Sequence, residues 1–190
     1  MHPGSGSGFR VTVDRSIWRL LGSPLVAGAA SGPLRGESVA VKDLFEVAGF
    51  AVGAGNPAYL AESRPAATTA PAAASLLAAG ADVLGIAQTD EFAYSIAGRN
   101  SHYGAPVNVA SPGSIPGGSS SGPASAVASG QASIGLGTDT AGSIRVPASY
   151  QGLWGLRATH GAIDTSGLLP LAPSFDAVGW LIRSPGVLVR

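Results

Sequence analysis

The sequence contains no cysteine and few charged side chains. Its 190 residues include 11 basic and 11 acidic side chains, so the formal charge is +0. A chain without cysteine forms no disulfide, no thiolate metal site and no cysteine nucleophile, and it fits a cytoplasmic protein. No basic run marks a phosphate-binding surface, so we expect no nucleic-acid partner.

Long apolar runs are also missing. The most apolar stretch, residues 76–87, is too short to cross a bilayer and contains Asp82 and two glycines, so we expect no membrane partner. Residues 1–10 are rich in Gly and Ser and lack the basic start and apolar stretch of a secretory signal. We therefore expect a disordered leader at 1–10 and one domain over 11–190, whose 45% hydrophobic content can bury a single core.

A strand–helix–strand pattern sets the fold class. Residues 38–41 form a short apolar, β-branched run, and residues 82–87 form another. Between them, Thr68 and Thr69 are candidate caps for a helix with Pro71 in its first turn, residues 72–79 as its body and Gly80 at its end. This order predicts a right-handed parallel crossover and an α/β fold, with a mixed sheet flanked by helices.

Two loops rich in Ser and Gly precede helical patterns. The first ends at residues 117–122, after an irregular stretch from 105, and leads into a helix that Pro123 opens and residues 124–128 continue. The second, residues 137–143, follows a strand predicted at 133–137 and places Ser143 at the start of a helix over 143–150. Backbone N–H groups at such positions can bind an anion.

An anion forms during acyl transfer, when the carbonyl oxygen becomes negative in the tetrahedral intermediate. A serine nucleophile also needs a base, and Lys42, at the end of the first strand, is the candidate. The reference pKa of lysine is about 10.4, so this role requires a buried, apolar site. The neighbouring residues 39–41 and Leu44 are apolar and favour such a site.

Three motifs together resemble the amidase signature family. They are Gly-Gly-Ser-Ser-Ser-Gly at 117–122, Gly-Thr-Asp-Thr-Ala-Gly-Ser-Ile-Arg-Val-Pro at 137–147, and Ala-Val-Lys-Asp-Leu-Phe at 40–45. The spacing between Ser119 and Ser143 is also that of the family. The resemblance implies a mechanism in which Ser143 attacks the amide, Ser119 relays its proton and Lys42 accepts it, with no metal and no organic cofactor.

The resemblance also implies the surroundings of this triad. The peptide bond Gly118–Ser119 is expected to be cis, and Ser120 to support the loop by hydrogen bonding. Asp139 and Arg145 are expected to form a structural ion pair. The oxyanion hole is expected from the backbone N–H groups of Thr140, Ala141, Gly142 and Ser143. Position 141 departs from the family, which usually has glycine there.

The branch and the extent of the chain are further expectations. Residues 90–95 and 102–104 resemble the indole-3-acetamide hydrolase branch, which suggests a small neutral amide such as an aryl-acetamide as substrate. The chain resembles the N-terminal catalytic portion of the family fold, truncated at the C-terminus, with Ser184 and Pro185 opening a helix. A homodimer or a completing chain is therefore a possible partner.

Two other functions compete with this one. Residues 118–122 match G-x-S-x-G, and an α/β-hydrolase esterase would use Ser120, Asp139 and His160 in that order. That motif requires a strand directly before it, which residues 110–116 do not resemble, since they contain two prolines. The other alternative is a truncated amidase-like binding module or subunit that has no activity.

Overall fold

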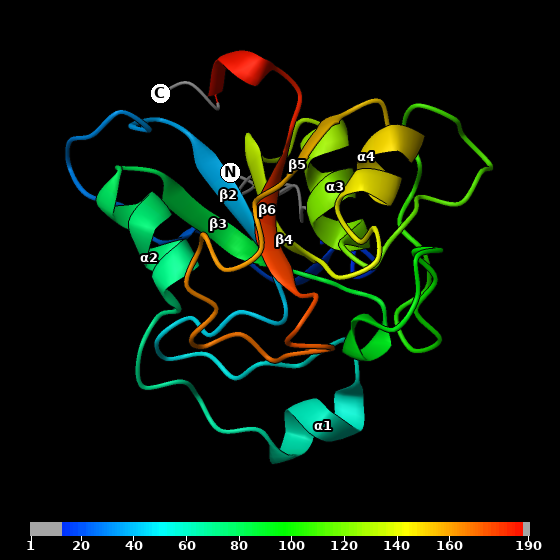
Figure 1. Cartoon of the computed structure of the whole chain (residues 1–190), viewed down its shortest axis with the longest axis horizontal. Helices are drawn as coiled ribbons and strands as arrows, with labels where there is room; N and C mark the ends of the chain where they lie inside the picture. The colour runs from blue at the N-terminus through cyan, green and yellow to red at the C-terminus, as the bar shows by residue number, and fades with distance from the viewer. Residues whose placement is uncertain (1–12, 188–190) are drawn as a thin grey trace, which may run out of the picture.

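The computed structural model describes residues 13–187, so the leader expected at 1–10 lies outside the described residues. A single six-stranded sheet runs through the molecule in the order β1-β3-β2-β4-β6-β5 (Figure 1). Its strands are β1 (Trp18–Val26), β2 (Ser38–Lys42), β3 (Asp82–Ala87), β4 (Ile134–Asp139), β5 (Trp154–Arg157) and β6 (Ala177–Ile182). The pairs β2–β3 and β2–β4 are parallel, and the others are antiparallel. The predicted mixed sheet is confirmed.

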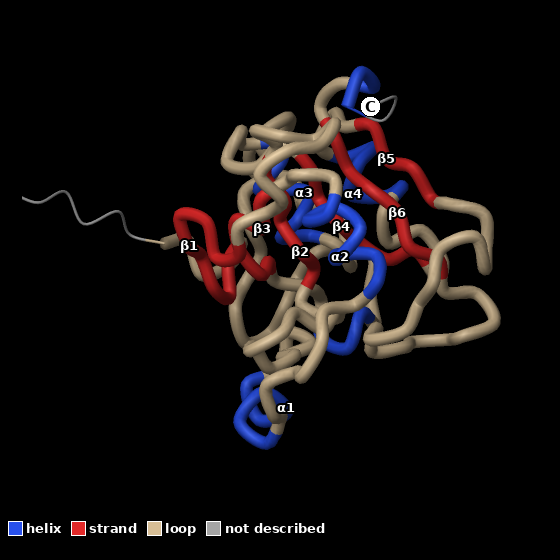
Figure 2. Tube along the Cα trace, turned by 90° about the vertical axis from the view of Figure 1, so that its left-hand side faces the viewer, coloured by secondary structure: helices blue, strands red, loops and turns tan. Residues whose placement is uncertain are grey.

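Helices cover both faces of the sheet. They are α1 (Pro57–Glu62), α2 (Pro71–Ala78), α3 (Ser121–Ala128) and α4 (Arg145–Tyr150), with 3₁₀ turns η1 (Glu91–Ala93) and η2 (Pro185–Val187). Helix α2 lies on one side of the sheet and α3 and α4 on the other, while α1 lies apart, beyond one end of the strands (Figures 1 and 2). No helix within residues 13–187 has the length and hydrophobicity to span a bilayer.

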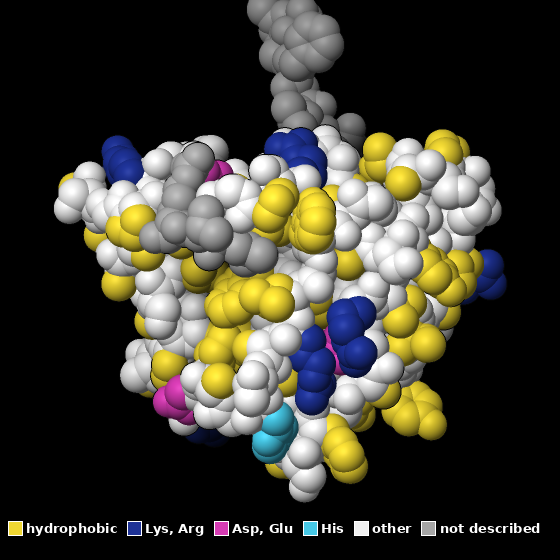
Figure 3. All heavy atoms as spheres, turned by 45° about the horizontal axis from the view of Figure 1, so that its top comes forward, with side chains coloured by type: hydrophobic (Ala, Val, Ile, Leu, Met, Phe, Trp, Pro, Cys, Tyr) yellow, Lys and Arg dark blue, Asp and Glu magenta, His cyan; other side chains and the backbone are white. Residues whose placement is uncertain are grey.

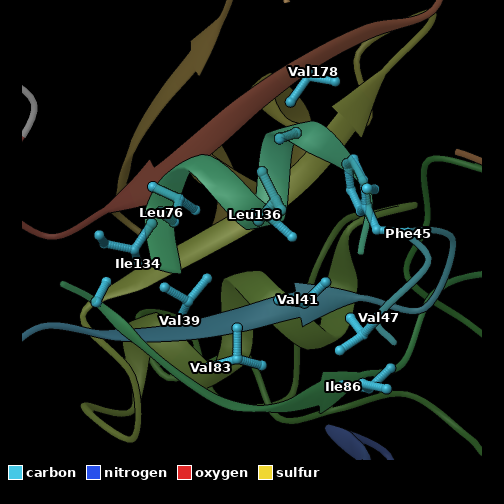
Figure 4. Packing of buried hydrophobic residues seen from close by; sticks show 14 of the residues in the cluster. Val39, Val41, Phe45, Val47, Leu76, Val83, Ile86, Ile134, Leu136 and Val178 are labelled. Atoms are coloured by element: carbon cyan, nitrogen blue, oxygen red, sulfur yellow. The ribbon is translucent and has the colours of Figure 1, made fainter. Parts of the chain in front are cut away.

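The alternation of side chains along the central strands divides the core in two. Val39 and Val41 of β2 pack with Leu76 of α2, together with apolar side chains of β3 and β4 (Figure 4). Ala40 points to the other face and packs with Val127 of α3. Side chains two apart in a strand share a face, so both faces of β2 are apolar and its run is continuously hydrophobic.

Several predicted boundaries move in the structure. Thr68 and Thr69 do not cap α2: its N-cap is Ala70, without a side-chain cap, and the Thr69 hydroxyl instead accepts a hydrogen bond from Ala48 N–H. Helix α3 begins at Ser121, before the expected Pro123. Strand β4 runs through Asp139 rather than ending at Gly137, because it pairs with β6 over its whole length.

The parallel strands place polar groups at one edge of the sheet. Carboxyl ends of neighbouring parallel strands meet at the same edge. Strand β2 ends there with Lys42, β3 leads there into Asp90, and β4 ends there with Asp139. This edge therefore gathers the two loops rich in Ser and Gly with the lysine.

Candidate active site

Lys42 is fully buried, with 0% of its surface exposed. Its ammonium nitrogen Nζ lies 2.8 Å from Ser119 Oγ and 2.8 Å from Thr138 Oγ1. The fold thus joins Lys42 to Ser119, as expected. It also adds Thr138, which the sequence reasoning missed because the contact spans two strands.

Burial lowers the pKa of Lys42 to about 7, because desolvation penalises the charged ammonium. The carboxylates of Asp90, Asp139 and Asp176 oppose this shift. A substantial fraction of Lys42 is therefore a neutral amine near neutral pH, with a lone pair that can accept a proton.

Ser119 is held through its backbone. The peptide bond Gly118–Ser119 is cis, as expected. The Ser119 carbonyl accepts hydrogen bonds from Asp90 N–H at 3.1 Å and from the Thr89 hydroxyl at 3.0 Å. A side chain at Gly118 would have its Cβ 2.5 Å from an Asp90 carboxylate oxygen, so only glycine allows this close approach.

Ser120 ties the two serine loops together. Its N–H donates to the Ser143 carbonyl at 3.1 Å, and its hydroxyl donates to the Thr138 carbonyl at 3.3 Å. Both groups of Ser120 are therefore committed to holding the loop, which agrees with the expected supporting role.

Ser143 is buried like Lys42 and Ser119, with 3% of its surface exposed. Within residues 13–187 its hydroxyl has no hydrogen-bond partner. The sequence predicted that Ser143 begins a helix, and this prediction is wrong. Helix α4 begins at Arg145, with Ile144 as its N-cap.

The Asp139 carboxylate organises the turn before α4. Its Oδ1 accepts from Gly142 N–H at 2.9 Å, and its Oδ2 accepts from the N–H groups of Ile144 and Arg145 at 3.2 Å each. The Arg145 guanidinium donates through Nε at 3.0 Å and Nη2 at 2.9 Å, so the predicted ion pair is confirmed. Although desolvation opposes ionisation, these hydrogen bonds lower the pKa of Asp139 to about 2.

The turn also decides which backbone donors are free. Gly142 N–H is committed to Asp139 and is therefore occupied. The N–H groups of Thr140, Ala141 and Ser143 have no acceptor within residues 13–187. The positive φ of the turn, 132°, falls on Gly142, so alanine at position 141 meets no left-handed backbone.

The residues of the esterase alternative are engaged elsewhere. Asp139 binds Arg145, and His160 Nε2 pairs with the Pro173 carbonyl at 3.0 Å on the surface. Ser120 follows the irregular loop rather than a strand. None of the three hydrogen-bonds another, so the structure does not bring this triad together.

Comparison with known proteins identifies the class. The Amidase family model matches residues 21–185, and the chain belongs to this family. It is 50% identical over 168 residues to "Amidase 1" of Arabidopsis thaliana, covering 88% of this chain and 40% of that protein. It is 43% identical over 161 residues to "Outer envelope protein 64, chloroplastic" of Arabidopsis thaliana, covering 85% and 27%.

A solved structure gives the same result for the fold. The allophanate hydrolase of Kluyveromyces lactis superposes with a TM-score of 0.75 at 38% identity, covering 79% of this chain and 24% of that one. The chain thus spans less than half the length of these relatives.

Proposed function

We propose that the chain carries the catalytic groups of an amidase that acts through a Ser143 acyl-enzyme. The Ser143 oxygen attacks the amide carbon while its proton passes through the Ser119 hydroxyl to the neutral amine of Lys42. The turn's free N–H groups bind the oxyanion. When the C–N bond breaks, Lys42 returns the proton to the leaving nitrogen, and water then hydrolyses the acyl-enzyme.

One observation carries this proposal. Lys42 Nζ lies 2.8 Å from Ser119 Oγ at a fully buried position, where desolvation favours the neutral amine. A lysine that served only as a structural cation would gain more from an ion pair, and none of the salt bridges within residues 13–187 includes Lys42.

The proposed substrate is a small neutral amide, with an aryl-acetamide as the first choice. This choice rests on the likeness of residues 90–95 and 102–104 to the indole-3-acetamide hydrolase branch. The similarity to "Amidase 1" of Arabidopsis thaliana and of Oryza sativa supports only an amide as the substrate. The branch remains a prediction. A cytoplasmic location and the lack of a cofactor belong to the same proposal.

A fluorophosphonate tests the proposal without knowledge of the substrate. Ser143 Oγ would attack phosphorus, fluoride would leave, and the proton would pass to Lys42. We expect one adduct per chain by intact-mass spectrometry, located at Ser143 by peptide mapping. An adduct at Ser120 would favour the esterase alternative. Folded protein without any adduct would refute activity of this chain and favour the binding module.

An exposed apolar face supports a proposal about partners. Trp154 and Leu156 of β5 are 59% and 42% exposed. Beside them, a groove of about 200 Å³ is lined by Leu34, Leu76, Ile134, Leu156, Trp180, Ile182 and Val187. Figure 3 shows hydrophobic side chains gathered on this side of the molecule. We propose that a second copy of the chain packs here.

Light scattering tests this pairing. We expect the mass to rise towards that of a dimer with increasing concentration, because burial of apolar surface favours association. Leu156→Lys should return the protein to a monomer, whereas Tyr94→Lys, at an exposed position on another part of the surface, should not. A monomer at every concentration would contradict self-association through this face.

A further inference from the structure

The loop between β5 and β6 crosses the edge of the sheet that carries the candidate site. Its last residue, Asp176, is 5% exposed. Asp176 Oδ1 accepts a hydrogen bond from the Thr140 hydroxyl at 2.5 Å. The same carboxylate accepts the N–H groups of Leu171 and Ala172, each at 3.0 Å to Oδ2. One buried carboxylate thus closes its own loop and holds a side chain of the oxyanion turn.

The middle of this loop is fixed to the segment that follows Lys42. Leu169 N–H donates to the Leu44 carbonyl at 2.9 Å, and Glu46 N–H donates to the Gly167 carbonyl at 2.8 Å. The loop therefore bridges the lysine side and the oxyanion side of the site. The hydrogen bonds of the loop to Leu44 and Glu46, together with the bond of Asp176 to Thr140, therefore limit the movement of Asp176.

Arg157 adds a second connection to the same turn. Its guanidinium donates to the Phe175 carbonyl at 3.0 Å and to the backbone carbonyl of Asp139. The peptide unit between Asp139 and Thr140 carries the free N–H of Thr140. Both of its residues are anchored, since Arg157 binds the Asp139 carbonyl and Asp176 binds the Thr140 hydroxyl.

The orientation of the Thr140 N–H group is important for the proposed oxyanion hole. Thr140 N–H has no acceptor within residues 13–187, so its direction is not set by a backbone hydrogen bond. The Thr140 side chain is held by Asp176, and this contact limits rotation of the peptide unit. An oxyanion donor helps only when it already points to the developing charge.

We propose that Asp176 is a positioning residue that holds the oxyanion turn through the Thr140 hydroxyl. This inference rests on the proposed function, because the turn needs a fixed geometry only if it binds an oxyanion. Asp176 does not touch the substrate; it acts through Thr140. The sequence contains no local sign of this contact, since 36 positions separate the two residues.

The test separates the two sides of the contact. Thr140→Val removes the hydroxyl, Thr140→Ser retains it, and Asp176→Asn removes the carboxylate. We expect Thr140→Val and Asp176→Asn each to lower the maximal rate constant of fluorophosphonate labelling by about 10- to 100-fold, with reagent affinity unchanged. Thr140→Ser should restore most of the rate, and the double variant should lose no more than the worse single variant.

Asp164→Asn is the matched control, because Asp164 is an exposed carboxylate of the same loop that binds only Ser166. Hydrogen–deuterium exchange of the 139–145 segment provides a readout independent of activity. It should accelerate in Thr140→Val and Asp176→Asn but not in Asp164→Asn. Wild-type rate and exchange in Thr140→Val would overturn the inference. If wild-type protein is not labelled, the proposed function fails, and the exchange data alone decide whether Asp176 holds the turn.

Discussion

Replacing Lys42 with methionine should lower the rate of Ser143 labelling at pH 8 by about three orders of magnitude, a typical contribution of a general base. Methionine fills most of the buried volume but accepts no proton. Ser119 Oγ and Thr138 Oγ1 both lose their partner Nζ. The measurement is the second-order rate constant of labelling, followed by intact mass.

The same substitution should raise stability at low pH, which distinguishes lost catalysis from lost folding. The folded-state pKa of Lys42 is about 7, well below its unfolded value of about 10.4. The unfolded state therefore binds more protons between these pH values, and the free energy of unfolding should rise with pH from about 7 to 10. Below pH 7 the full cost of burying the amine is present, and Lys42→Met removes it. The gain is reduced by about 1–3 kcal/mol for each buried hydroxyl, of Ser119 and Thr138, that loses its partner, so the net stabilisation should be small and confined to low pH.

The pH dependence of labelling follows from the same pKa. Below about pH 7 the ammonium form dominates, so the rate should fall tenfold for each further pH unit, and it should level off above pH 8. Lys42 is the only lysine in the sequence, so a single ¹⁵Nζ signal reports its titration directly. Arg183→Met removes an exposed cation and should change neither the pH dependence of labelling nor the titration of the Lys42 ¹⁵Nζ signal. A wild-type midpoint near 10 would contradict the proposed role of Lys42.

The sequence predicts the centre of the fold better than its margins. Strands β2 and β3 and helix α2 have strong local signals: β-branched runs, a proline in the first turn and Gly80 after the last. Strand β1 lacks them, because Gly22 and Pro24 interrupt it and its register with β3 shifts twice. Strand β5 is only four residues long, and its antiparallel pairing with β6, rather than its composition, makes it a strand.

The candidate site divides in the same way. Lys42, Ser119, Ser143 and the ion pair of Asp139 could be predicted because they lie in contiguous motifs. Thr138 and Asp176 could not, because each acts through a contact made only when distant strands meet. Asp90 is a partial case: it follows β3 at the polar edge of the sheet, and it is 1% exposed with a raised pKa caused by burial. Its place beside Ser119 depends on the folded loops.

Replacing Asp139 with asparagine should destabilise the fold by about 1.5–3 kcal/mol, because it removes a buried carboxylate whose ionised oxygens accept several hydrogen bonds. Asp139 has 0% exposure, and its carboxylate accepts three backbone N–H groups as well as the Arg145 guanidinium. The amide has one acceptor oxygen and a donor that faces other donors. Urea unfolding at pH 7 measures the loss, and Asp164→Asn, an exposed carboxylate, should change stability by less than about 0.5 kcal/mol.

The acid limit of stability provides a second measurement of the same group. The folded-state pKa of Asp139 is about 2, below the unfolded value of about 3.9. Its stabilising contribution is therefore complete above about pH 4 and is lost as pH falls from 4 to 2. Asp139→Asn should flatten this part of the pH profile, and Arg145→Gln should do so only in part, because the backbone N–H groups still hold the carboxylate. Equal acid sensitivity in wild type and Asp139→Asn would show that other carboxylates control the acid transition. If Asp139 does control it, the turn that carries Ser143 owes its shape to one ionised side chain.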